Sequence, residues 1–152
     1  MGDVYARLAE LGVAIPPVVP PVAAYVPAVQ TGNHVYVSGQ LPMVDGALPA
    51  TGLVGADVSA ERAKELARQS GINVLAAVEA LVGLGRVVRV VKIVGFVASA
   101  PGFTGQPAVV NGASELFGEV FGDAGRHARS AVGVSSLPLN APVEVEAILE
   151  IA

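Results

Sequence analysis

The sequence predicts an α+β fold in which a single sheet carries two long helices on one of its faces. The first observation is that two amphipathic stretches alternate with valine-rich stretches, in the order strand, strand, helix, strand, helix, strand, strand. The second is length, since 152 residues suit one domain spanning residues 1–152. The third is that only 14% of the residues are charged, against about a quarter in an average soluble domain.

Residues 1–17 form an N-terminal extension in this prediction. Val4 and Leu8 recur at helical spacing and predict a short helix within residues 1–15. Gly12 suits the end of that helix, because glycine readily adopts the left-handed conformation. The paired prolines that follow prevent the helix from continuing.

A proline-rich segment and a hairpin come next. Residues 18–29 read as extended chain, and the Gly32-Asn33 pair marks a turn. Residues 34–38 alternate β-branched and aromatic side chains, which predicts a strand paired with the chain before the turn. Prolines and glycines make residues 42–57 a loop or an irregular edge strand.

Two helices are predicted for the rest of the chain. Residues 59–82 carry apolar side chains at three- and four-residue spacing, and Ser59 is a natural N-cap. A second helix covers residues 107–121, where Pro107 fits the first helical position.

Three further strands complete the sheet. Residues 86–99 form a long strand with partial alternation, and residues 130–134 and 143–151 form the last two strands. If both helices cover one face of the sheet, the other face requires a partner.

The scarcity of charge has two explanations, a membrane segment or burial between subunits. Residues 11–44 contain no Asp, Glu, Lys or Arg, but six prolines interrupt the run. A spanning helix needs about 20 mostly apolar residues with intact backbone hydrogen bonds. No signal peptide pattern is present at the N-terminus. We therefore expect no membrane segment and favour burial between subunits over a monomer with an apolar surface.

Composition also limits the chemistry. The chain has no cysteine, which excludes disulfides and thiolate nucleophiles and is consistent with a cytoplasmic location. The formal charge of −4 and an aromatic content of 5% argue against nucleic acid as the main partner.

Charged residues near the C-terminus are candidates for a binding site. The guanidinium of Arg129 could bind a carboxylate with two parallel hydrogen bonds, or could simply pair with Asp123 or Glu119 at the surface. Glu144 and Glu146 share one face of the last strand because side chains alternate along a strand. If that face lines a cleft between subunits, Glu144 could position or deprotonate a water molecule. If it faces solvent, both are inert.

Other polar residues give weaker signals. Tyr25, Ser38 and Asn111 stand beside apolar runs and could orient a small ligand, or could bond to the backbone alone. His34 and His127 are the only histidines, so we expect no metal site. No glycine-rich nucleotide-binding fingerprint and no G-x-S-x-G motif occurs.

Several segments, taken together and in order, resemble the RidA family, the reactive intermediate deaminases also called YjgF or L-PSP endoribonucleases. The distinctive motifs are SGQ, the Arg129-Ser130 pair, and LP before a VEVEAI strand. The similar stretches are residues 25–42, 63–79, 91–97, 111–117 and 129–148.

The resemblance implies a chorismate-mutase-like subunit, a homotrimer with clefts between subunits, and no metal or organic cofactor. It implies hydrolysis of reactive 2-imino or enamine acids to 2-keto acids and ammonia. Arg129 matches the family's carboxylate-binding arginine, and Glu144 matches the acidic residue near the hydrolytic water. Four other residues match cleft positions of the family: Tyr25, Ser38, Gly39 and Asn111. Backbone N–H groups near Ala131 would add hydrogen bonds to the ligand.

The sequence also departs from the family. Ala131 stands where a cysteine is frequent, and residues 1–17 extend beyond the short members. Two alternatives to an imine deaminase therefore stay open. One is a trimer that binds a small carboxylate ligand without turnover, and the other is the endoribonuclease or translation inhibitor activity attached to the family name.

Overall fold

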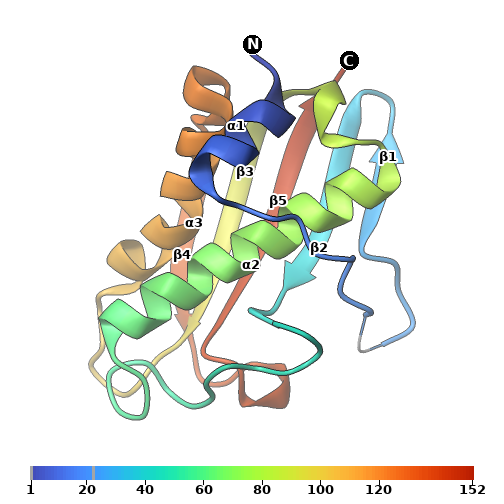
Figure 1. The fold of residues 1–152 in the computed structure, drawn as a ribbon. Helices are drawn as coiled ribbons and strands as arrows, with labels where there is room; N and C mark the ends of the chain where they lie inside the picture. The colour runs from blue at the N-terminus through green and yellow to red at the C-terminus, as the bar shows by residue number, and fades with distance from the viewer. Residues whose placement is uncertain (1, 22) are drawn as a thin grey trace.

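A five-stranded sheet with helices on one face forms the body of the chain. The computed structural model describes residues 2–21 and 23–152. The sheet has the order β1-β2-β5-β3-β4, in which β3 and β4 are parallel and the other neighbours antiparallel. Figure 1 shows α2 and α3 side by side across one face. The elements are α1 (Val4–Leu11), β1 (Ala28–Thr31), β2 (His34–Gln40), α2 (Ala60–Leu81), β3 (Val87–Ala98), α3 (Gln106–Phe121), β4 (Ala128–Val134) and β5 (Val143–Ile151), with short 3-10 turns at Leu84–Arg86, Gly122–Gly125 and Pro138–Asn140.

The two long helices confirm the expectation from the sequence. Ser59 caps α2, since its hydroxyl accepts a hydrogen bond from the backbone N–H of Arg62 at 3.1 Å. Small residues let α2 and α3 approach closely. A Cβ added to Gly112 of α3 would overlap the carbonyl of Lys64, and one added to Gly71 of α2 would lie 3.0 Å from Leu116. This contact fixes where α3 presents its polar side chains to the sheet.

The last strand shows the alternation that divides the sheet into two faces. Val143, Val145, Ala147, Leu149 and Ile151 are all buried against the helices, and the residues between them are only partly buried. Burying one row of side chains sets the pairing register of β5, because a slip of one residue would expose that row.

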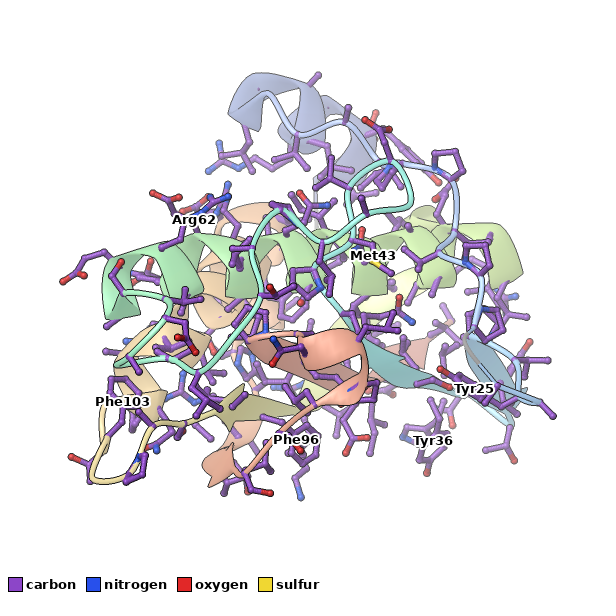
Figure 2. The ribbon with its side chains drawn as sticks, turned by 90° about the horizontal axis from the view of Figure 1, so that it is seen from below. Tyr25, Tyr36, Met43, Arg62, Phe96 and Phe103 are labelled. Carbon is purple, nitrogen blue, oxygen red and sulfur yellow. The ribbon has the colours of Figure 1, made fainter. Side chains whose placement is uncertain are left out.

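The face away from the helices is uncovered in the subunit. Val29, Tyr36 and Val132 on this face are 51%, 47% and 43% exposed. Phe96 of β3 also projects from it, and Figure 2 shows Tyr36 and Phe96 on the side of the sheet away from α2. We call this surface the open face. Its exposed aromatic and branched side chains are typical of a contact surface.

The N-terminal segment forms the short helix predicted within residues 1–15, in addition to the two long helices. α1 begins after Asp3, whose carboxylate accepts from the N–H of Tyr5 at 2.9 Å, and ends at Gly12 with φ 68°. Val4 and Leu8 are buried in the core, because the apolar face of this short helix packs on α3 and on the turn after α2. The chain then crosses α2 on its way to β1 (Figure 1).

Two strands extend beyond their predicted limits. β2 continues to Gln40 through an irregular step between Val37 and Gln40, and β4 begins at Ala128. Among the helices of the described residues, none is long and apolar enough to span a membrane.

Candidate functional site

Arg129 is held by neutral acceptors behind the edge strand β4. Its Nη1 donates to Oδ1 of Asn111 at 2.7 Å and to Oγ of Ser114 at 3.3 Å, and its Nη2 donates to the carbonyl of Pro107 at 3.4 Å. The three acceptors recur along one side of α3 at helical spacing. The guanidinium therefore has a fixed orientation, and its partners in the described part of the chain are all neutral.

The surface ion pairs proposed as an alternative for Arg129 are not formed. Glu119 pairs with Arg68 at 3.1 Å, and Asp123 lies 3.9 Å from Arg126. None of the ion pairs within residues 2–21 and 23–152 includes Arg129. Its Nε also makes no hydrogen bond to a described residue. Nε–H and one Nη2–H point along the same edge of the guanidinium, the edge that matches a carboxylate.

A histidine extends this cluster. Nε2 of His127 lies 2.9 Å from Oγ of Ser114, and Nδ1 lies 2.6 Å from the carbonyl of Gly125. Burial and, to a smaller extent, the charge of Arg129 lower the pKa of His127. Ser114 is not among the site residues predicted from the sequence, and neither is the contact that links His127 to Arg129. The spacing could have indicated both, since Ser114 follows Asn111 by three helical positions and His127 precedes Arg129 by one strand period.

Glu144 lines a small pocket between the end of β2 and the proline-rich segment before β1. The pocket has a volume of about 50 Å³. The Glu144 carboxylate forms no hydrogen bond or ion pair with a described residue. Burial raises its pKa above the usual value, and the charge of Glu146 on the same face raises it further. The lining residues are Val19, Pro20, Pro21, Tyr25, Pro27, Gly39, Gln40, Leu41, Met43, Pro138 and Glu144.

Gly39 leaves room for this carboxylate. A Cβ at position 39 would lie 2.5 Å from Oε1 of Glu144 and 2.7 Å from its Cδ. Because this Cβ would displace the carboxylate, Glu144 can occupy its observed position only when residue 39 is glycine. Tyr25 lies on the same pocket wall, and its side chain is 43% exposed.

Ser38 has a structural role in the subunit. Its hydroxyl donates to the carbonyl of Val26 and its N–H to that of Pro27, both at 2.8 Å. These bonds hold the segment that carries Tyr25 against β2. Ser38 therefore positions the pocket wall, which agrees with the alternative of a hydroxyl bonded to the backbone.

The predicted site residues fall into two groups. Tyr25, Gly39 and Glu144 line the small pocket, and Ser38 holds the segment that carries Tyr25. We call these four residues the acid half-site. Arg129 and Asn111 lie between β4 and α3, with Ala131 two residues further along β4, and we call this the arginine half-site.

The two half-sites lie on opposite faces of the sheet. Arg129 pairs with Ile93 of β3, which is fully buried under the helices. Glu144 pairs with Phe96, which projects from the open face. Paired residues share a face of the sheet, so one subunit cannot bring both charges to one small ligand. Ala131 pairs with buried Gly95, and beyond β4 the described chain adds no strand, so the outer edge of β4 is free.

Within the part of the chain that the structure describes, no three His, Asp or Glu side chains come together in a way that suits a metal ion.

Comparison with known proteins identifies relatives over nearly the whole chain. The family model described as Endoribonuclease L-PSP matches residues 17–151. Protein TCP17 of Trypanosoma cruzi is 45% identical over 152 residues, covering 99% of this chain and 95% of that protein. The 2-iminobutanoate/2-iminopropanoate deaminase of Escherichia coli strain K12 is 41% identical over 127 residues, covering 84% and 87%. The crystal structure of Atu1372 from Agrobacterium tumefaciens, a protein of unknown function, is 49% identical with a TM-score of 0.91, covering 98% and 92%.

Proposed function

Because the chain belongs to the Endoribonuclease L-PSP family, which includes the RidA imine deaminases, we propose that it hydrolyses small 2-imino acids to 2-keto acids and ammonia. The observation that carries the proposal is the guanidinium of Arg129, which is fixed by three neutral acceptors and has no acidic partner in the described chain. The edge formed by Nε and Nη2 is complementary to a carboxylate. A charge-assisted pair of this kind is about twice as strong as a neutral hydrogen bond.

Glu144 supplies the proton transfer in this proposal. Water adds to the imine carbon, a C–O bond forms, and the π electrons of the C=N bond move to nitrogen. Glu144 takes a proton from the water and returns it to nitrogen, which gives a carbinolamine. It then takes the hydroxyl proton and passes it to the amine, and ammonia leaves as the C–N bond breaks and the C=O bond forms. Its raised pKa favours this role, because an acid that exchanges its proton nearer neutral pH can act in both directions. The atoms balance without a cofactor or redox step.

A complete site requires a second copy of the chain in this proposal. Arg129 and Glu144 lie on opposite faces of one sheet, and the open face carries exposed apolar residues. We infer a homotrimer in which the arginine half-site of one copy faces the acid half-site of its neighbour. The low content of charged residues supports such burial.

Release of ammonia from freshly generated 2-iminobutanoate tests the activity. We expect the wild-type protein to accelerate release and Arg129→Ala to lose the acceleration. Arg126→Ala is the matched control, since Arg126 lies three residues away, is highly exposed and pairs only with Asp123 in the described chain. Equal rates for wild type and Arg129→Ala would refute the assignment of Arg129.

The same geometry would also serve a trimer that binds keto acids without turnover. The apolar lining of the pocket beside Glu144 and the anchoring Arg129 favour a small acid, whether the protein turns it over or only binds it. A 2-keto acid that raises the melting temperature of the wild type but not of Arg129→Ala, without any ammonia release, would favour binding alone.

The family description also names an endoribonuclease. A net charge of −4 and only three tyrosines and four phenylalanines give little support for an RNA surface. RNA cleavage that survives purification and disappears in Glu144→Ala would favour that function instead.

A further inference from the structure

A chain of hydrogen bonds connects Arg129 to a half-buried histidine, His127. Nη1 of Arg129 donates to Oγ of Ser114, which lies 2.9 Å from Nε2 of His127. Nδ1 of His127 lies 2.6 Å from the carbonyl of Gly125. We propose that His127 is a positioning residue, which acts through the Ser114 hydroxyl to set the orientation of the arginine that binds the substrate carboxylate. This inference rests on the proposed function of Arg129.

The carbonyl of Gly125 decides the tautomer of the ring. A carbonyl oxygen only accepts hydrogen bonds, so Nδ1 must carry a proton and donate it. In a neutral ring Nε2 is then unprotonated and accepts. The structure thus assigns to His127 the Nδ1–H tautomer.

The tautomer in turn orients the hydroxyl of Ser114. The Ser114 hydroxyl donates its single hydrogen bond to Nε2. The lone pairs of Oγ are then free to accept the hydrogen bond from Nη1 of Arg129. The second N–H of Nη1 donates a hydrogen bond to Oδ1 of Asn111 at 2.7 Å. Both protons of Nη1 are therefore occupied inside the subunit, and the edge formed by Nε and Nη2 is left for a ligand.

The surroundings of His127 keep the ring neutral and in place. The ring packs edge-on against Phe117, with centroids 6.0 Å apart and planes at 84°. Burial and the nearby charge of Arg129 lower the pKa of His127, although the Gly125 carbonyl opposes this. Asp123 and Arg126 are close to His127 in the sequence, but among the described ion pairs they bind each other at the surface.

The tautomer can be read directly by ¹⁵N NMR of the full-length protein labelled at histidine. Only two histidines are present, so His34→Gln assigns the signals and serves as the control. At neutral pH we expect a protonated Nδ1 and a hydrogen-bonded, unprotonated Nε2 for His127. Ser114→Ala should move the Nε2 signal toward that of a free acceptor. A protonated Nε2, or no response to Ser114→Ala, would overturn the proposal.

Binding of 2-oxobutanoate tests the consequence for the site. We expect Ser114→Ala and His127→Phe each to weaken binding by about threefold to tenfold, the usual loss for one neutral hydrogen bond. The double variant should be no weaker than either single variant, since both break one chain of bonds. Ser114→Thr, which keeps the hydroxyl, should bind like the wild type. Additive losses, or full affinity in both single variants, would contradict the positioning role.

Failure of the proposed function can be distinguished from failure of the positioning role of His127. If Arg129→Ala binds 2-oxobutanoate as well as the wild type, the proposed function fails whatever the NMR result. If Arg129→Ala loses binding but Ser114→Ala retains it, Arg129 keeps its role and His127 has none. Should His127→Phe not fold, Ser114→Ala decides, because it removes one oxygen and leaves the ring packed on Phe117.

Discussion

The arginine and acid half-sites use the same fold in opposite ways. Arg129 is fixed by three hydrogen bonds from α3 and lies behind the sheet edge, whereas Glu144 has no hydrogen bond to a described residue and lies on the open face. Neither charge has a counter-charge among residues 2–21 and 23–152. Had both lain on one face within reach, they would have paired and cancelled each other. In the proposed function, the counter-charge comes from a ligand and the second half of the site comes from another copy.

Leaving such groups uncompensated costs stability. A charged group that is partly withdrawn from water without a partner destabilises the fold. Functional sites commonly retain such groups because the ligand or transition state supplies the missing interaction. The two half-sites should therefore respond differently to substitution.

The largest expected effect is on turnover at the acid half-site. Glu144→Gln removes the proton acceptor and should slow ammonia release by about 100-fold or more, the contribution typical of a general base. Keto acid affinity, measured by calorimetry, should change little. Glu150→Gln on the same face of β5 is the control. If Glu144→Gln lost affinity and turnover alike, the two half-sites would not have separate roles.

The next effect is on affinity at the arginine half-site. Arg129→Lys keeps the charge but loses the two-pronged geometry, so keto acid binding should weaken by about tenfold to 100-fold. Arg126→Lys should have no effect, because that side chain lies at the surface. Calorimetric titration measures both, and an unchanged affinity in Arg129→Lys would show that charge alone is recognised.

A smaller effect is expected at Gly39. Gly39→Ala places a Cβ 2.5 Å from Oε1 of Glu144 and should displace the carboxylate. Turnover should fall by roughly threefold to tenfold with little change in keto acid affinity, because the proton acceptor is misplaced while the anchor stays. Gly118→Ala in α3 is the control, as nothing lies within 4 Å of its added Cβ. Equal effects in the two variants would remove the role assigned to Gly39.

The smallest effect is on stability. Because burial and Glu146 raise the pKa of Glu144, the folded chain binds that proton more tightly than the unfolded chain. Stability therefore falls as pH rises from the unfolded pKa through the folded pKa. Glu144→Gln should melt higher than the wild type at pH 7, on the order of a few degrees, and the difference should shrink toward pH 4. A lower melting temperature at pH 7 would mean that the carboxylate has a stabilising partner.

Local patterns in the sequence were sufficient for most of the fold. The N-cap at Ser59, the glycine after α1 and the alternation in β5 each act within a few residues, and all three predicted their elements. The docking of α1 was missed because burial of Val4 and Leu8 depends on distant residues. Fold class and helices therefore followed from local rules, and the docking of α1 did not.

The site was predicted only in part for the same reason. Arg129 and Glu144 were identified from strand spacing and family resemblance, but their placement on opposite faces depends on the register of three strands. Ser114 is related to Asn111 by helical spacing, and His127 is related to Arg129 by strand spacing. A search for one periodicity alone therefore does not bring Ser114 and His127 together. Long-range pairing thus decides which residues meet.

In the proposed trimer, one working site combines Arg129 of one copy with Glu144 of another. To test this, Arg129→Ala and Glu144→Gln chains with different tags are co-expressed, and assemblies that carry both tags are purified. Each variant alone should be inactive. Hybrid assemblies should recover about a third of wild-type ammonia release, because every mixed trimer has one cleft in three that joins two intact half-sites. Hybrids as inactive as the parents, despite a confirmed mixed composition, would contradict the claim.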